Sequence, residues 1–323
     1  MPQKIEYEVI EDWEKLPEGW SFVEVAGVAT DSQDRVYVFN RGDHPIIVFS
    51  PDGDFLETWG EGVFTNPHGI YIGPDDTVYC ADNFDHTVRI FEPDGTLRRT
   101  LGTKNQPSDT GFVPGKSPVQ KGGDPFNMVT NVALSQQGDL YVSDGYGNAR
   151  VHKFTSNGDY LTSWGEPGDG PGEFNLPHAI AVDKNDRVYV ADRENSRIQV
   201  FDLQGNYITE WGHVLRPDDL YIDAEENLYV AELGERAGKG PNVKVEPHAP
   251  HARVSVLSLE GEVITQFGGD VPTDPGNFFA PHGIWADSQG DLYVGEVTYS
   301  GGGRFGLVPL DCHSLQKFVR IRS

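Results

Sequence analysis

The sequence has little cysteine and no long apolar run. Two cysteines in 323 residues, Cys80 and Cys312, cannot build a disulfide framework, so both are expected to be reduced thiols in the core. Because no run of about 18 apolar residues occurs, no membrane partner is expected. The start, MPQKIEYEVIEDW, has no apolar signal core, which predicts a cytoplasmic protein.

Positive charge is also scarce. The chain has 25 Lys and Arg against 50 Asp and Glu, a formal net charge of −25. Nucleic-acid binding calls for a basic face, so a nucleic-acid partner is not expected. The excess of acid fits a protein whose turns are decorated with carboxylates.

What the sequence does contain is a repeat of short strands. A tyrosine flanked by Val, Leu or Cys occurs six times, at Tyr37, Tyr79, Tyr141, Tyr189, Tyr229 and Tyr293. These tyrosines are 42, 62, 48, 40 and 64 positions apart, so the basic unit has about forty residues, with insertions. Four-strand units of this length predict an all-β fold, a six-bladed β-propeller that fills residues 1–323 as one domain. The sixth repeat lacks its outer strand, and the alternating residues 5–10 are expected to supply it and close the ring.

The long insertions fall at related places in the repeats. They lie between repeats, or between the second and third strands of a repeat, at 103–127, 165–175, 233–252 and 299–312. In a propeller, loops of these two kinds are on the same face. This face is therefore expected to be the working face of the protein.

Three histidines share one repeat position. His68, His178 and His282 each follow a proline and lie eleven residues before the central tyrosine of repeats 2, 4 and 6. Alternate blades of a six-fold ring are related by a three-fold axis, so the three imidazoles should converge on the central channel. Three imidazoles with an open outward position predict a catalytic Zn²⁺ site, with Fe, Mn or Co as alternatives.

A second set of positions follows each central tyrosine. The residue three places on is acidic in five repeats and Asn40 in the other, which we interpret as a structural bond to loop amides. The next residue is arginine only at Arg41 and Arg193, in repeats that face each other, and two guanidiniums suit a substrate carboxylate. In repeat 3, Tyr146 lies one place later and is the expected general base.

These stretches resemble a known family. FNRGDH (39–44), NPHGI (66–70), YVSDGYGNARV (141–151), LPHAIAV (176–182) and APHGIWA (280–286) are similar to motifs of the peptidyl-α-hydroxyglycine α-amidating lyases. The resemblance covers nearly the whole chain. It implies a propeller of NHL-type repeats with Zn²⁺ on the three histidines, Tyr146 as base, and Arg41 and Arg193 as substrate-binding residues. It also implies cleavage of an N-(α-hydroxyglycyl) hemiaminal to an amide and glyoxylate.

Three departures from the family pattern qualify what the resemblance implies. The family has an aspartate that completes a structural Ca²⁺ site where this chain has Gly283, so Ca²⁺ is expected to be absent or weakly bound. The family has a disulfide cysteine where this chain has Gly147, and it acts on peptides in the secretory pathway. The expected substrate is therefore a small molecule or short peptide with a carboxylate, bound under loops that carry His248 and His251.

Two other functions remain open on sequence grounds. The same metal could activate water against an ester, lactone or amide, which would make the protein a hydrolase. An NHL-type propeller could also be a non-catalytic interaction platform. A non-catalytic platform does not need three convergent histidines, so the lyase is the favoured hypothesis.

Overall fold

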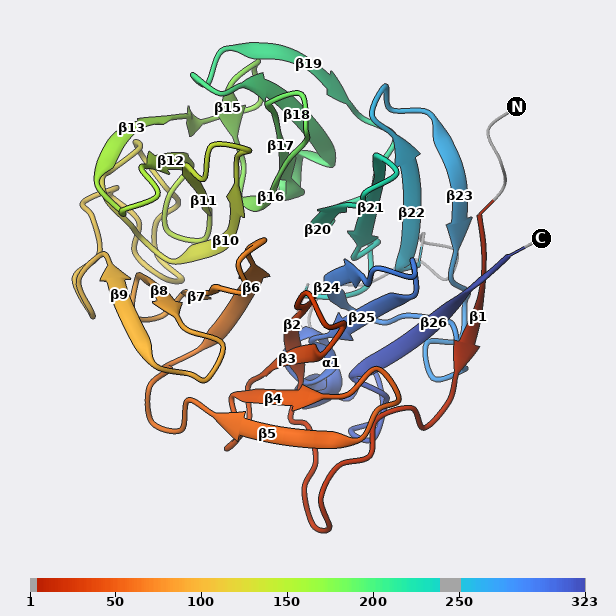
Figure 1. Ribbon diagram of the computed structural model, residues 1–323. Helices are drawn as coiled ribbons and strands as arrows, with labels where there is room; N and C mark the ends of the chain where they lie inside the picture. Colours follow the sequence, from red (N-terminus) through yellow and green to blue (C-terminus); the bar gives the residue numbers. More distant parts are fainter. Residues whose placement is uncertain (1–4, 239–250, 323) are drawn as a thin grey trace. The chain divides into compact units, whose positions relative to one another are not determined.

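The computed structural model describes residues 5–238 and 251–322. The chain is nearly all β, and six four-stranded antiparallel sheets form the blades of a six-bladed β-propeller (Figure 1), as the sequence predicts. Among the described residues, no helix is long and apolar enough to cross a membrane. By their internal contacts the residues divide into two units, 1–61 with 221–323, and 62–220, called here the first and second unit.

Three complete sheets belong to the second unit. Blade 2 consists of β6 (Pro67–Ile72), β7 (Val78–Asp82), β8 (Thr87–Phe91) and β9 (Leu97–Leu101). Blade 3 consists of β10 (Val129–Leu134), β11 (Leu140–Asp144), β12 (Arg150–Phe154) and β13 (Tyr160–Trp164). Blade 4 consists of β16 (Pro177–Val182), β17 (Arg187–Asp192), β18 (Arg197–Asp202) and β19 (Tyr207–Trp211).

The remaining sheets contain the first unit's strands. Blade 1 consists of β2 (Val25–Thr30), β3 (Val36–Asn40), β4 (Ile46–Phe49) and β5 (Phe55–Trp59). Blade 5 consists of β20 (Pro217–Ile222), β21 (Asn227–Glu232), β22 (Arg253–Ser258) and β23 (Val263–Phe267). Blade 6 consists of β24 (Pro281–Ala286), β25 (Leu292–Glu296), β26 (Leu315–Ile321) and β1 (Glu6–Ile10).

The N-terminal strand completes the sixth blade, which confirms the expectation for residues 5–10. In Figure 1, β1 lies beside β26, and the two pair antiparallel from Glu6–Ile321 to Ile10–Lys317. The Tyr7 hydroxyl is also 3.0 Å from the hydroxyl of Tyr229 in blade 5. Strands from the two ends of the chain therefore share one sheet, and a side chain of β1 reaches the core tyrosine of another blade.

The central tyrosine joins the core of a blade to its first turn. Tyr189 is fully buried, and its hydroxyl donates to Asp183 Oδ2 at 3.0 Å. The same carboxylate accepts the Asn185 and Arg187 amides of the β16–β17 turn, at 2.9 and 2.8 Å. The bond from the tyrosine to the aspartate six residues earlier recurs at Tyr229–Asp223 and Tyr293–Asp287, so one aspartate serves both the turn and the phenol in blades 4, 5 and 6.

The acid that ends the second strand is structural, as predicted. Asp192 is fully buried and accepts the Asn175 amide at 2.7 Å, while Arg197 Nε donates to it at 2.8 Å. In blade 1, Asn40 plays the same part, because its Oδ1 accepts the Val23 amide at 3.1 Å. Each bond ties the loop that enters a blade to the end of that blade's second strand.

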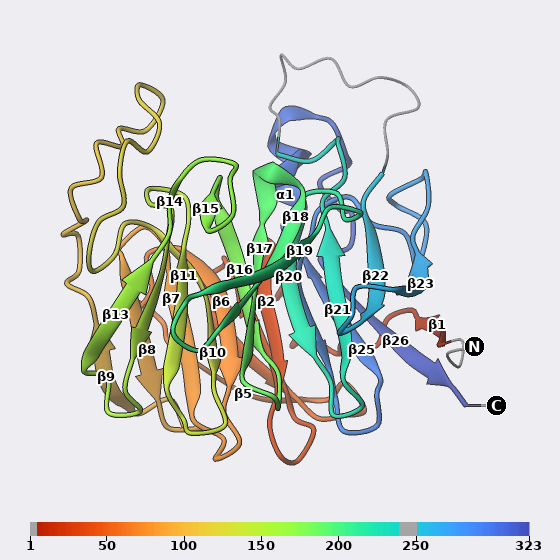
Figure 2. The same cartoon turned by 90° about the horizontal axis from the view of Figure 1, so that it is seen from above.

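The inserted segments of the second unit lie on the side from which its inner strands start. Residues 103–127 and the short strands β14 (Glu166–Pro167) and β15 (Glu173–Phe174) rise on one side of the sheets (Figure 2). In the first unit, α1 (Thr298–Gly301) and η2 (Gly303–Phe305) follow β25. The 233–252 segment lies partly outside the described residues.

His152 anchors the 103–127 insertion to blade 3. Its ring is fully buried, with Nδ1 3.3 Å from Asp124 Oδ1 and Nε2 3.3 Å from Asp144 Oδ2. An ionised carboxylate accepts hydrogen bonds but cannot donate them. The imidazole can therefore serve both carboxylates only when each of its two nitrogens carries a proton. Burial alone would lower the pKa of His152, but the adjacent carboxylates of Asp124 and Asp144 outweigh burial and raise that pKa.

Replacing His152 with Gln should therefore destabilise the protein more at low pH than at high pH. A raised folded-state pKa gives stability that is fully present below the ordinary value of 6.5 and is lost as pH rises through the folded-state pKa. We expect a loss of about 1.5–3 kcal/mol at pH 5.5 and a smaller loss at pH 9. Denaturant midpoints measured at both pH values test this, with the exposed His213→Gln as control. An equal loss at both pH values would contradict the ionic anchor.

Candidate metal and substrate site

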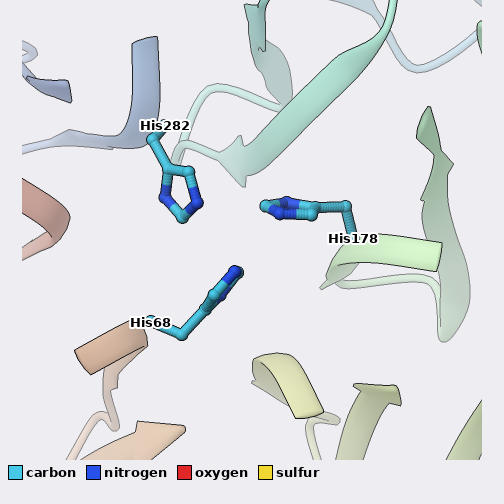
Figure 3. A group of neighbouring side chains, drawn as sticks. All are labelled: His68, His178 and His282. Carbon is cyan, nitrogen blue, oxygen red and sulfur yellow. The ribbon is translucent and has the colours of Figure 1, made fainter. Parts of the chain in front are cut away.

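Two of the three predicted histidines lie together in the second unit. His68 and His178 occupy the second positions of β6 and β16, and each is only 1% exposed. Their ring centroids are 4.7 Å apart with planes inclined at 57°, and the rings point toward one another (Figure 3). Strands β6 and β16 both neighbour β10 of blade 3, which positions the two imidazoles on either side of that blade.

Main-chain carbonyls fix the tautomer of both rings. His68 Nδ1 donates to Thr130 O at 2.7 Å, and His178 Nδ1 donates to Asp218 O at 2.6 Å. Because a carbonyl oxygen only accepts, Nδ1 carries the proton in each ring and Nε2 of the neutral imidazole keeps its lone pair. Metal-ligating histidines are commonly oriented by such a bond, so both residues fit a metal.

Tyr146 joins the two imidazoles on their Nε2 side. Its hydroxyl is 3.0 Å from His178 Nε2 and 3.4 Å from His68 Nε2. The tyrosine follows Gly145, where a side chain would collide with the Pro177 carbonyl oxygen, so the glycine lets this loop pack against β16. The phenol that the sequence predicts as a base thus lies within hydrogen-bond distance of two predicted ligands.

Arg193 reaches the same phenol from blade 4. It lies in η1 (Arg193–Asn195), and its Nη1 donates to the Tyr146 hydroxyl at 3.2 Å and to Asp218 Oδ1 at 3.1 Å. Its Nε donates to Glu194 Oε1 at 2.9 Å. Burial opposes its charge, but the interactions with Tyr146, Asp218 and Glu194 outweigh burial and raise the pKa of Arg193. The arginine therefore contacts both the predicted base and two acids.

Asp218 was not singled out as a site residue by the sequence. Besides accepting from Arg193, its Oδ1 is 3.2 Å from His178 Nδ1, and its side chain is fully buried. Burial raises the pKa of Asp218 to about 6, although Arg193 acts in the opposite direction. The available signal was its repeat position, since Asp218 stands in blade 5 where His178 stands in blade 4.

The first unit repeats the histidine arrangement once. His282, 5% exposed, occupies the second position of β24, and its Nδ1 donates to Ala26 O at 2.6 Å. Its Nε2 is therefore also the nitrogen with the lone pair. Each of the three histidines thus donates to a main-chain carbonyl at the same repeat position of a neighbouring blade. The side chain at that position does not take part in the bond.

Arg41 lies in the first unit and is held by an acid that the sequence did not reveal. Its Nη1 donates to Glu24 Oε1 at 2.9 Å and lies 3.4 Å from Ser300 Oγ. Glu24 is 3% exposed, and its other oxygen accepts the Ser300 amide at 2.7 Å. Glu24 consequently connects Arg41 to α1 in the insertion of blade 6.

Known proteins of two kinds are similar to this chain. Human NHL repeat-containing protein 3 is 35% identical over 198 residues, 60% of this chain and 56% of that protein. Peptidyl-alpha-hydroxyglycine alpha-amidating lyase 1 of Drosophila melanogaster is 30% identical over 258 residues, 74% of this chain and 44% of that protein. The chain is related to the amidating lyases and to NHL-repeat proteins. The aligned part of this chain spans about half the length of each of these two curated relatives.

Two further comparisons concern the fold. A family model described as a 6-bladed beta-propeller matches residues 125–237. The solved structure of virginiamycin B lyase from Staphylococcus aureus superposes with a TM-score of 0.60 at 14% identity, covering 98% of this chain and 100% of that chain. At this identity the likeness shows the fold alone. Both findings confirm the propeller predicted from the repeats.

The departure from the amidating-lyase pattern at Gly283 has a steric reason. A Cβ at this position would lie 2.6 Å from Gly27 Cα, so an aspartate does not fit there without a backbone shift. In blade 5 the same repeat position holds Asp219, which is 8% exposed and accepts from Asn131 Nδ2 at 2.6 Å. The expectation that Ca²⁺ is absent or weakly bound remains a prediction.

Of the two loop histidines, the structure describes His251 alone. His248 lies outside the described residues. The Nδ1 of His251 is 2.8 Å from Asp270 Oδ1, and both side chains are partly or largely exposed. His251 is thus accounted for by a surface ion pair.

Proposed function

We propose that the protein is a metal-dependent lyase that cleaves the C–N bond of an N-acyl-α-hydroxyglycine to an amide and glyoxylate. The observation that carries this proposal is the placement of the Tyr146 hydroxyl 3.0 and 3.4 Å from the Nε2 atoms of two histidines with fixed tautomers. Relatives named as amidating lyases support the same class of reaction.

His282 is the third ligand in this proposal. It takes the repeat position of His68 and His178, and its Nδ1 bonds a carbonyl in the same way. Blades 2, 4 and 6 alternate in a six-bladed propeller. On this repeat symmetry we propose that the three histidines drawn in Figure 3 together hold one metal ion. A bound Zn²⁺, or Fe, Mn or Co, would supply a Lewis acid for the hydroxyl of the substrate.

Tyr146 and the two arginines supply the rest of the chemistry. Tyr146 takes the proton of the substrate hydroxyl, and the oxygen electron pair forms the aldehyde C=O of glyoxylate. The electron pair of the broken C–N bond leaves with the amide nitrogen, which takes up the proton. Atoms and charge balance without an oxidant or water. Arg193 and Arg41 bind the carboxylate and orient the carbinol carbon toward Tyr146.

Metal-loaded protein incubated with α-hydroxyhippurate should release benzamide and glyoxylate in equal amounts. Product analysis by liquid chromatography distinguishes this reaction from hydrolysis, which would release benzoate. Benzoate as the product would favour the hydrolase. No turnover of either kind would favour a non-catalytic NHL propeller.

Single substitutions should separate the base from the carboxylate-binding residues. Tyr146→Phe should lower kcat by about 10²–10⁴-fold with little change in KM, since only the proton acceptor is lost. Arg41→Ala should mainly raise KM for the free acid and leave an ester-capped substrate unaffected. Arg35→Ala, which breaks an ion pair at the β2–β3 turn, is the matched arginine control. An ester turned over by the wild type as well as the acid would rule out carboxylate binding.

A further inference from the structure

Two loops on either side of blade 3 have the same length and share a residue with positive φ at the same place. One runs from Asp82 to Thr87 in blade 2 and the other from Asp192 to Arg197 in blade 4. Each has a residue with positive φ just before its third strand, His86 at 62° and Ser196 at 51°. The two loops can therefore be compared residue by residue, which makes Phe84 the counterpart of Glu194.

The hydrogen bonds of the two loops also match. Each loop receives a main-chain amide from the segment that enters the next blade: Met128 N donates to His86 Nδ1 at 3.0 Å, and Arg216 N donates to Ser196 Oγ at 3.2 Å. Both donors have positive φ, 69° for Met128 and 49° for Arg216. Met128 is accordingly the counterpart of Arg216.

In blade 4 the matched pair is ionic and borders the site. Glu194 accepts from Arg216 at 3.0 and 3.3 Å and from Arg193, which in turn donates to Tyr146. In blade 2 the matched pair is Phe84 and Met128, both apolar. Blade 3, which carries the predicted base, is therefore flanked by a loop with an ion pair in blade 4 and by a loop with apolar residues at the two matching positions in blade 2.

Phe84 is exposed on a loop that is otherwise firmly held. Its side chain is 53% exposed, whereas its neighbours Asn83 and Asp85 are 3% and 0% exposed. Asp85 accepts from Thr87 Oγ1 and Arg89 Nη2, each at 2.5 Å, and Asn83 accepts from Asn66 Nδ2 at 2.7 Å. A half-exposed aromatic ring on a rigid loop costs little entropy when a ligand packs against it.

We propose that Phe84 is a specificity-determining residue that receives the apolar acyl group of the substrate. The inference rests on the proposed function, because it assumes a ligand whose carboxylate lies toward Arg193. A ligand held there extends its N-acyl group away from the Glu194–Arg216 pair, toward the blade 2 side. Aromatic or branched acyl groups are therefore favoured over small or charged ones.

Binding of unreactive ligands to the metal-loaded protein tests the inference separately from catalysis. Hippurate (N-benzoylglycine) and N-acetylglycine share the carboxylate and amide but lack the hydroxyl that reacts. Phe84→Ala should weaken hippurate binding about five- to tenfold in titration calorimetry and change N-acetylglycine binding by less than about twofold. Phe84→Leu, which stays apolar, should restore part of the affinity for hippurate.

Leu97→Ala is the matched control, because Leu97 is 51% exposed on the outer strand β9 of the same blade. It should change neither affinity. Equal effects of Phe84→Ala on both ligands, no effect on either, or no hippurate binding by the wild type would each overturn the assignment of Phe84. Loss of hippurate preference in Phe84→Ala without glyoxylate release by the wild type would support the acyl subsite and contradict the lyase.

Discussion

The hydrogen bond from a histidine Nδ1 to a main-chain carbonyl of a neighbouring blade is the constraint on which the site depends. It occurs at His68, His178 and His282, with donor–acceptor distances of 2.6–2.7 Å. It fixes the tautomer and the ring orientation together, and it leaves Nε2 for a ligand. The inner strands must approach closely for this bond to form. Gly69 shows how closely, since a Cβ there would be 2.5 Å from Thr130 O, the oxygen that accepts from His68.

The same constraint explains which positions of the repeat are free to vary. The residues that offer the carbonyl are Ala26, Thr130 and Asp218, and three different side chains serve because the backbone makes the bond. One of these side chains makes a further contact, since the Asp218 carboxylate accepts a hydrogen bond from Arg193. The repeat thus supplies a rigid frame, and individual blades add Tyr146, Arg41 and Arg193 at the loop ends.

Sequence periodicity was sufficient for the fold, because every repeat has a central tyrosine and five of the six have an acid three residues later. It also predicted the N-terminal strand of blade 6, whose alternating residues needed a partner. It did not reveal Glu24 or Asp218 as partners of Arg41 and Arg193, because their roles depend on distances between loops of different blades. Phe84 was missed for a related reason. Its exposure and its correspondence to Glu194 become apparent only when its loop is compared with that of blade 4.

The metal content of the purified protein tests the account most directly. If three carbonyl-oriented histidines hold one ion, elemental analysis should find about one transition metal per chain, and His178→Ala should lose most of it. Ser163→Ala, an exchange on the outer strand β13 of the second unit, should retain the metal. Fully active protein that is free of metal, or a His178→Ala variant that keeps its metal, would contradict the proposed site.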